Sequence, residues 1–505
     1  MAQTPIAGSA GAAQGIRPER LFVGSCVALI ATAVAFATVG DIMGDLKIKF
    51  ILTNEHVGWI GGAAMWGFTV SIFILGPLCD ALGMRTLMWL AFLCHLAGVL
   101  VMIFANGFGM LFFGALIIAL GNGTVEAACN PLTATIYPDR KTQKLNQFHM
   151  WWPGGIVLGG LAAYALGKLS LGAGAGAHLW QIKLALVLIP AVIYGVLFAG
   201  QKFPATERVQ AGVSFGGMWR ATLLRPLFLL LLLCMMLTAS MELGPNRWVP
   251  SVLKAGGIPG ILVLVWISGL MAVLRFYAGP VIHRLSNTGI LLGSAVLSAI
   301  GLYWLSFATT NTMAFASATV FAVGVCYFWP TMLGTVAERV PRGGALALAL
   351  MGGAGMAVVG LVTSPLMGRK ADSYMNERLP LDKTVVVLQQ TVDTFPTLAA
   401  QAKGKTGKDI LAAMEKAQAA LKKAKAQNQL PEPDTANALR DIINTGGQAP
   451  VAKEADALLG PADNYGGLMS FRYVAPLGII LAVVFGLLYA SDKARGGYRV
   501  EKIGH

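Results

Sequence analysis

The sequence predicts an all-helical integral membrane protein, with twelve transmembrane helices in two pseudo-symmetric six-helix halves. Three observations support this fold class: the low charge content, twelve apolar runs, and landmarks that recur in the second half of the chain. The 505 residues are 56% hydrophobic and 12% charged, with a mean hydropathy of +0.65, whereas soluble proteins carry about 25% charged residues. Most of the chain is therefore expected to face lipid, and the net charge of +14 indicates membrane topology rather than nucleic-acid binding.

Each apolar run is long enough to cross a bilayer, which takes roughly 20 residues. Each run must also be helical, because lipid offers no hydrogen-bond partner to a free backbone group. The runs cover residues 21–43, 56–79, 85–105, 108–136, 146–169, 180–200, 226–250, 258–282, 288–308, 311–336, 345–367 and 472–490.

The runs divide the chain into segments, and one polar segment interrupts the second half. We expect a cytoplasmic N-terminal tail (1–20), an N-terminal half (21–200), a cytoplasmic linker (201–225), spans 7–11 (226–368), an extracytoplasmic helical insert between spans 11 and 12 (369–465), span 12 (466–490) and a cytoplasmic C-terminal tail (491–505). Within the insert, Lys408–Gln427 predicts an amphipathic helix, and Pro431, Pro433 and Gly446–Gly447 predict breaks. The insert is expected to cap the outer mouth, to bind a partner or to be loosely ordered.

Basic residues in the short loops predict the orientation. If the N-terminus is cytoplasmic, the loops on its side carry most of the basic residues, Arg140 and Arg208 among them. The opposite short loops carry only Lys47, Lys49, Lys168, Lys183, Arg247 and Lys254. This bias predicts a multi-pass protein of the cell (inner or cytoplasmic) membrane with both termini in the cytoplasm.

The two halves share landmarks at a nearly constant offset, which indicates a duplicated six-helix unit. Asn130-Pro131 is followed by Asp139-Arg140, and Trp329-Pro330 is followed at the same spacing by Glu338-Arg339, 199 residues later. The same offset maps Gly154 onto Gly353. Parallel six-span halves around a central site are one of the transporter architectures.

Acidic residues inside the apolar runs are candidates for a transport site, because charge within a bilayer is costly and usually functional. Asn122, Glu126 and Asn130 are spaced i, i+4, i+8, so they share one face of their span. A polar stripe on a membrane helix is expected to face a cavity, and burial favours the protonated form of a carboxyl group. The alternative is a structural Glu126 paired with Arg275, the one base well inside a run.

Span 7 repeats this pattern with Thr238, Glu242 and Asn246. Asp41 lies 201 residues before Glu242, in a nearly equivalent place in the first half. Either acid is a candidate proton site or hydroxyl-binding group, and the alternative for Asp41 is a solvated position at the outer mouth.

His149 and several aromatic residues are secondary candidates. His149 could join a proton relay, because histidine titrates near physiological pH, or it could be structural. Stacking on a sugar face, or ordinary packing within the bundle, is expected of Trp151, Trp152, Trp248, Tyr327, Phe328 and Trp329.

One loop motif links the sequence to a known superfamily. The stretch Gly76-Pro77-Leu78-Cys79-Asp80-Ala81-Leu82-Gly83-Met84-Arg85 resembles the G-x-L-x-D-x-x-G-x-R signature between spans 2 and 3 of the major facilitator superfamily. Its glycines permit a tight turn, and Asp80 is expected to pair with Arg85 or to cap a helix N-terminus. The resemblance covers the whole chain except 369–465.

A second motif is more specific. The stretch Gly121-Asn122-Gly123-Thr124-Val125-Glu126-Ala127-Ala128-Cys129-Asn130-Pro131 is similar to the G-x-G-x-x-E-x-A-x-N-P motif in span 4 of the fucose–galactose–proton symporter family. Leu145-Asn146, Asp41 and Leu52-Thr53-Asn54 also match that family. The resemblance implies that Glu126 contacts substrate and that Asp41 carries the proton. The stretches 147–153 and 241–248 depart from the family pattern.

These features predict a secondary active transporter that performs proton-coupled symport of a sugar or similar polar small molecule by alternating access. A proton or sodium ion is the expected coupling ion, and no other cofactor, no metal and no nucleic-acid partner is expected. The alternatives are a drug or metabolite efflux antiporter of the same fold, and a non-transporting membrane sensor that uses 369–465. We expect a monomer, and no enzyme, since no nucleophile–base or metal constellation is present in the sequence.

Overall fold

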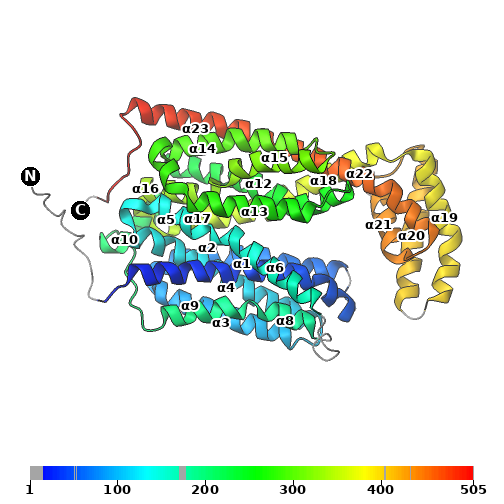
Figure 1. The fold of residues 1–505 in the computed structure, drawn as a ribbon, viewed down its shortest axis with the longest axis horizontal. Helices are drawn as coiled ribbons and strands as arrows, with labels where there is room; N and C mark the ends of the chain where they lie inside the picture. Colours follow the sequence, from blue (N-terminus) through cyan, green and yellow to red (C-terminus); the bar gives the residue numbers. More distant parts are fainter. Residues whose placement is uncertain are drawn as a thin grey trace, which may run out of the picture.

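All the regular structure is helical in the computed structural model, which describes residues 15–50, 52, 54–169, 178–402, 405–432 and 434–503. Two helical bundles lie side by side, one from the first half of the chain and one from the second (Figure 1). A third, smaller helical unit projects from one end of the second bundle, and the first and last described residues lie at the opposite end.

The described residues of the first bundle form six long helical segments, of which two are broken. Its helices are α1 (Pro18–Lys49), α2 (Asn54–Leu82), α3 (Met84–Ile103), α4 (Phe108–Ile136), α5 (Lys141–His149), α6 (Trp151–Lys168), α8 (Leu179–Ala185) and α9 (Leu188–Phe198). The breaks between α5 and α6 and between α8 and α9 each precede a proline, Pro153 and Pro190. Proline has no N–H to donate to the turn before it, so it loosens the helix there.

The second bundle repeats this arrangement. Its helices are α12 (Pro226–Ala255), α13 (Gly260–Phe276), α14 (Ala278–Leu305), α15 (Asn311–Val325), α16 (Phe328–Arg339), α17 (Gly344–Val358), α18 (Ser364–Arg378), α22 (Pro450–Val474) and α23 (Pro476–Ala494). A linker with α10 (Glu207–Gln210) and α11 (Phe215–Leu223) joins the two bundles.

Equivalent helices make equivalent contacts in the two bundles. The pairs α3–α4, α2–α4 and α1–α6 of the first bundle correspond to α14–α15, α13–α15 and α12–α17 of the second. A short 3₁₀ turn follows the fourth segment of each half, at Pro138–Arg140 and Pro341–Gly343. The packing therefore matches the duplication expected from the sequence landmarks.

Ten helical stretches among the described residues are long and apolar enough to cross a membrane. Two of the twelve expected runs are outside this set. The run 146–169 is divided between α5 and α6, and the run 258–282 contains α13, which is apolar but has only 17 residues. Large apolar side chains remain exposed on the outer faces, such as Leu361 at 77% and Leu487 at 68%, as expected of surfaces that meet lipid.

The bundles meet through α2 and α17, through α6 and α13, and through α5 and α16. Glycine allows the closest of these approaches. A Cβ added at Gly76 on α2 would lie 2.0 Å from the Cβ of Ala349 on α17, and one at Gly353 would lie 2.7 Å from the ring of Phe73. The glycines of the loop motif and of the 352–355 run thus set the distance between the bundles.

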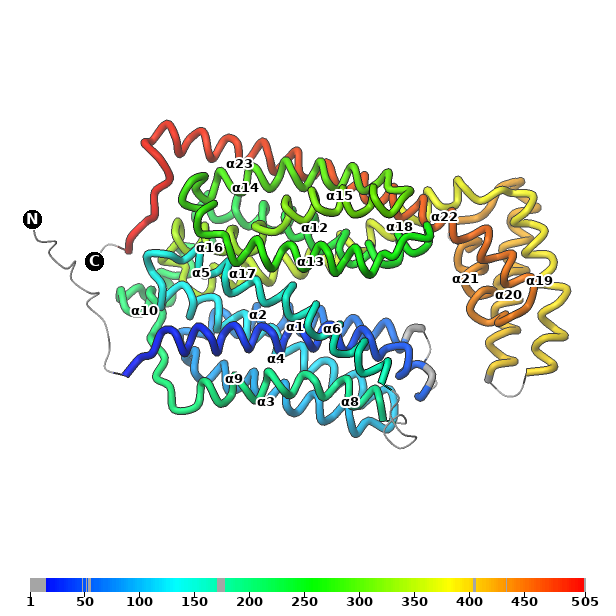
Figure 2. The backbone as a smooth tube through the Cα atoms, viewed as in Figure 1, coloured from blue at the N-terminus to red at the C-terminus, as the bar shows by residue number. Residues whose placement is uncertain are grey.

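The insert is a folded helical unit with its own apolar core. It contains α19 (Leu381–Gln401), α20 (Lys405–Gln427) and α21 (Asp434–Gly446), which lie beside the ends of α18 and α22 (Figure 2). Its core includes Leu388, Phe395, Leu439 and Ile442. Arg440 on α21 pairs with Asp463 at 2.8 Å and with Asp372 at 3.1 Å, so it ties α21 to both long helices.

The structure confirms the helix expected at 408–427 and the breaks at Pro431 and Gly446–Gly447, whereas Pro433 lies outside the described residues. It differs from the expected boundaries of the insert. Positions 369 and 465 both fall inside helices, because α18 continues to Arg378 and α22 begins at Pro450. The insert is therefore connected to its bundle by continuous helices, and its described residues form packed helices.

Candidate functional site

A cavity of about 470 Å³ lies between the two bundles. It is lined by α1, α2, α4 and α6 of the first bundle and by α12, α13 and α17 of the second. Its α1 residues run from Ala35 to Met43, in the half of that helix farther from the N-terminus. The cavity therefore occupies the end of the molecule away from the chain termini.

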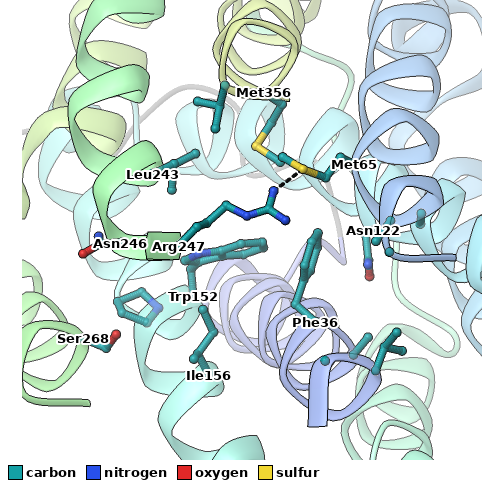
Figure 3. Close-up of a pocket in the computed structure, with 18 of the residues that line it drawn as sticks. Phe36, Met65, Asn122, Trp152, Ile156, Leu243, Asn246, Arg247, Ser268 and Met356 are labelled. Carbon is teal, nitrogen blue, oxygen red and sulfur yellow. Dashed lines mark hydrogen bonds between the residues drawn. The ribbon is translucent and has the colours of Figure 1, made fainter. Parts of the chain in front are cut away.

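The walls of the cavity are mainly apolar. Their large side chains include Phe36, Met65, Trp152, Ile156, Leu243 and Met356 (Figure 3). The rings of Phe36 and Trp152 meet edge to face, with centroids 5.1 Å apart, and form an aromatic wall. Such a surface suits a flat or ring-shaped solute.

A few polar side chains also line the cavity: Asn122, Glu242, Asn246, Arg247 and Ser268. The Arg247 side chain reaches from α12 into the middle of the cavity and ends beside Met65, whose sulfur its guanidinium contacts (Figure 3). The side-chain oxygen of Asn246 is buried without a hydrogen-bond partner. Arg247 is counted with the basic residues of the short loops, at the end of the run 226–250, whereas α12 extends to Ala255 and carries Arg247 inside the bundle.

A small chamber of about 20 Å³ adjoins the cavity and shares Trp152, Glu242, Leu243 and Met356 with it. Its remaining lining residues are Phe68, Glu126, His149, Arg275 and Trp329. The chamber brings together acidic, basic and aromatic candidates from both halves of the sequence. They are buried, so any charge on them depends on the partners that the protein provides.

The first bundle contributes Glu126, Asn130 and His149 to this cluster. Asn130 Nδ2 donates to Glu126 Oε2 at 2.6 Å, as expected of residues spaced i, i+4 on one helix. His149 Nε2 lies 3.0 Å from Asn130 Oδ1, and its Nδ1 lies 3.8 Å from Glu126 Oε1. The acid, the amide and the imidazole thus form one connected group.

The second bundle contributes Arg275 and Glu242. Arg275 Nη2 donates to Glu242 Oε1 at 2.7 Å, and Arg275 Nε donates to the carbonyl of Cys326. Arg275 Nη1 donates to the carbonyl of His149 at 3.1 Å, which is in the other bundle. Arg275 therefore pairs with Glu242 and not with Glu126, and it links the two halves through a backbone oxygen. The other oxygen of Glu242 is buried without a partner.

Asn122 departs from the polar stripe that the spacing predicts. It lines the cavity, but its Oδ1 lies 2.8 Å from Nε2 of His95, whose Nδ1 lies 2.9 Å from the hydroxyl of Tyr194. Sequence reasoning missed His95, although a lone histidine in the apolar run 85–105 was a visible signal. The amide of Asn122 is thus held toward α3.

Two other candidates lie outside the cavity and the chamber. Asp41 pairs with Lys183 of α8 at 2.6 Å, and its side chain is 37% exposed. Asn146 donates to the carbonyl of Thr142 and to the hydroxyl of Thr331, between α5 and α16. Lys183 belongs to a helix and not to a loop. Of the stretch Leu52-Thr53-Asn54, Thr53 and the Asn54 side chain lie outside the described residues.

The end of the molecule near the chain termini is closed by polar contacts between the bundles. Glu338 Oε1 accepts from the hydroxyl of Thr142 at 2.7 Å, and its Oε2 accepts from Asn287 at 2.9 Å. Asn287 also donates to the hydroxyl of Tyr498 in the C-terminal segment. Nearby, Arg339 pairs with Asp492 at 2.6 Å. Glu338 and Arg339 are the recurring pair of the internal repeat.

The loop motif belongs to this closed end as well. Asp80 pairs with Arg208 of the linker at 2.6 Å and accepts from the hydroxyl of Thr206, so the expected pairing with Arg85 is replaced by a contact to α10. Arg85 is exposed. Gly83 has a φ of 81°, a conformation that favours glycine at this turn before α3.

Two bundles of apolar helices around a central cavity, closed at one end, define a polytopic membrane protein of transporter architecture. Residues 21–367 match the Major Facilitator Superfamily, and the chain belongs to that superfamily. Its members are transporters and not enzymes. The described residues contain no group of three or more His, Cys, Asp or Glu that could hold a metal ion.

Individual relatives are distant. The Bacillus subtilis protein NiaP, whose name assigns it to niacin and nicotinamide transport, is 20% identical over 344 residues, which are 66% of this chain and 83% of NiaP. Human synaptic vesicle glycoprotein 2A is 22% identical over 172 residues, 33% of this chain. The chain spans only 23% of the length of that glycoprotein.

Solved structures share the fold at low identity. The E. coli fucose:proton symporter FucP has a TM-score of 0.57 at 17% identity, covering 70% of this chain and 92% of FucP. A double-tryptophan variant of the xylose transporter XylE has a TM-score of 0.61 at 12% identity, covering 93% of this chain and 95% of that one. These similarities establish the fold and leave the substrate open.

Proposed function

We propose that the protein is a proton-coupled symporter that moves a small polar solute by alternating access between its two halves. The observation that carries this proposal is the buried Glu126–Asn130–His149 group beside the Arg275–Glu242 pair, directly adjoining the cavity between the bundles. Ionisable groups in this position are expected to handle protons or substrate, since a purely structural ion pair inside a membrane is costly.

The proposed topology has twelve spans, an extracytoplasmic insert and both termini on the cytoplasmic side of the cell membrane. The proposed oligomeric state is a monomer. With that orientation the cavity faces outward, and the contacts of Glu338, Asn287 and Asp80 close the cytoplasmic side. The positive-inside distribution of basic residues supports this orientation. The conformation then corresponds to the state that accepts substrate from outside.

Coupling requires that the protonated and deprotonated forms of the proton site favour different access states. We assign the proton to Glu126, because its carboxylate interacts with His149 and lies beside the guanidinium that bridges the bundles. A change of charge on Glu126 acts on the strength of that bridge. The resemblance to the fucose–galactose–proton symporters implies Asp41 instead, but Asp41 is half-exposed and paired with Lys183.

A sugar is one candidate substrate. It is supported by the span-4 motif, by the aromatic wall of Phe36 and Trp152, and by fold similarity to FucP and XylE, which are named for fucose and xylose. An efflux antiporter is the second candidate, and the mainly apolar walls of the cavity favour it. NiaP adds niacin and nicotinamide to the compounds worth testing.

The test is uptake into proteoliposomes with an imposed inward proton gradient. Labelled fucose, galactose, glucose, nicotinate and nicotinamide are offered to the wild type, to Glu126→Gln and to Glu415→Gln, which removes an exposed carboxylate of the insert as a control. Gradient-driven uptake that is lost only in Glu126→Gln supports the proposal. Proton-driven export of a hydrophobic dye without uptake of any solute contradicts it and supports the antiporter.

A further inference from the structure

We infer that the substrate is an organic anion, a carboxylate on a compact ring-sized body, and that Arg247 binds the carboxylate. This inference rests on the proposed transport function and names the substrate class of the same cavity. It replaces a neutral sugar with an anionic solute.

Among the described residues that line the cavity, Arg247 is a cation without an acidic partner. Its guanidinium contacts the thioether of Met65, which is neutral and a weak acceptor. Among the described residues, no carboxylate lies within 4.0 Å of its nitrogens, whereas Arg275 is paired with Glu242. The two arginines thus differ: one has a built-in partner and the other points into the space where a solute would bind (Figure 3).

The transport cycle makes this difference consequential. Arg247 is exposed while the cavity is open, so water solvates it. When the halves close over the solute, Arg247 must lose that water, and an unpaired charge in an apolar enclosure is strongly unfavourable. A bound carboxylate restores a partner through two parallel hydrogen bonds to the guanidinium. A neutral solute leaves the charge uncompensated.

The surrounding groups indicate the rest of the solute. The aromatic wall of Phe36 and Trp152 offers a flat apolar surface, and Asn246, one residue from Arg247, also lines the cavity and has a side-chain oxygen without a hydrogen-bond partner. Ser268 lies on α13, which packs beside α12 in the same bundle. A cavity of about 470 Å³ suits a single ring with its substituents. A uronate sugar or an aromatic carboxylate with a hydroxyl group fits this set.

The experiment compares matched pairs that differ only in the carboxylate: galacturonate with galactose, glucuronate with glucose, and 4-hydroxybenzoate with 4-hydroxybenzamide. Binding to the purified protein in nanodiscs is measured by thermal shift and by the fluorescence of Trp152 and its neighbours, with no proton gradient. The variants are Arg247→Gln and Arg247→Lys, with Arg369→Gln on the exposed part of α18 as the control.

We expect at least one anionic member to bind, and its neutral partner to bind at least about tenfold more weakly. Arg247→Gln should weaken binding of that anion by a similar factor. Arg247→Lys should recover part of the binding, and Arg369→Gln should change nothing. Because Arg247 has no ion-pair partner among the described residues, its variants should fold, and unchanged unfolding of the ligand-free protein verifies this.

Preference for the neutral members, or the absence of any Arg247-dependent binding across the panel, overturns the inference. A parallel uptake assay separates this failure from that of the transport proposal. Gradient-driven uptake of a neutral sugar would support the transport proposal and contradict the inference that the substrate is an anion. Arg247-dependent binding of an anion without gradient-driven uptake would support the anionic substrate and contradict the proposal of proton-coupled transport.

Discussion

At the two ends of the interface between the bundles, polar side chains differ in whether the protein itself provides their hydrogen-bond partners. At the end near the chain termini, side chains of both bundles satisfy one another through Glu338, Asn287 and Thr142. At the other end the bundles diverge around an apolar cavity, in which Arg247 and Asn246 retain unmet binding capacity. The closed end is therefore stabilised by its own contacts, and the open end has groups available for a solute.

The buried cluster lies between these ends, and breaking it should have the largest effect. Arg275→Met leaves the Glu242 carboxylate buried without a partner. Removing one partner of a buried ion pair lowers the free energy of unfolding by about 3–5 kcal/mol. We expect a marked loss of thermal stability in detergent and no transport. The double variant Arg275→Met with Glu242→Met should recover most of the stability and none of the transport. Recovery of transport in the double variant would contradict a role for the pair.

The closed end should open when its shared acceptor is removed. Glu338→Ala deprives Thr142 and Asn287 of their partner, an effect of about 1–3 kcal/mol. Spin labels at Asp139→Cys and His283→Cys, both exposed at this end, should then show a larger population at long distance. The same labels with Asp409→Asn, an exposed change in the insert, provide the control. An unchanged distance distribution would mean that other contacts hold this end closed.

The close approach of α2 to α17 offers a comparison between two glycines on one helix. Gly76→Ala places a methyl group 2.0 Å from the Cβ of Ala349, whereas Gly61→Ala on the cavity side meets nothing within 4 Å. We expect Gly76→Ala to destabilise the protein by about 1–3 kcal/mol and Gly61→Ala to be neutral or stabilising. Thermal unfolding of both variants checks the prediction, and equal effects would refute it.

The smallest effect is expected at the outer pair. Asp41→Asn weakens a partly exposed ion pair with Lys183, which contributes about 0–1 kcal/mol. Stability and gradient-driven uptake should both change little, with uptake staying within about twofold. Loss of proton-driven uptake with exchange retained would instead assign the proton to Asp41, as the family resemblance implies.

Much of the fold follows from local features of the sequence. Hydropathy located the long helices, and the recurring Asn130-Pro131 and Trp329-Pro330 landmarks indicated the repeated packing. The spacing of Glu126 and Asn130 places them on one face of a helix, and the structure shows a hydrogen bond between them. The continuation of α18 and α22 into the insert was harder to predict, since the polar composition after residue 369 resembles that of a loop.

The errors concern residues whose position depends on tertiary packing. Arg247, near the end of the apolar run 226–250, is expected with the basic residues of the short loops, but α12 continues to Ala255 and turns it into the cavity. The pairing of Arg275 with Glu242 rather than Glu126, and of Asp80 with Arg208 rather than Arg85, joins segments far apart in the chain. Periodicity within one helix contains no information on such partners.

The central claim is that Glu126 couples proton movement to transport across the cavity. The most direct measurement compares two modes in the same proteoliposomes: accumulation of the labelled solute driven by an inward proton gradient, and exchange of labelled for unlabelled solute with no gradient. We predict that Glu126→Gln abolishes accumulation and retains exchange, because a permanently neutral side chain still permits the loaded carrier to change access. Accumulation at the wild-type level in Glu126→Gln would contradict the account.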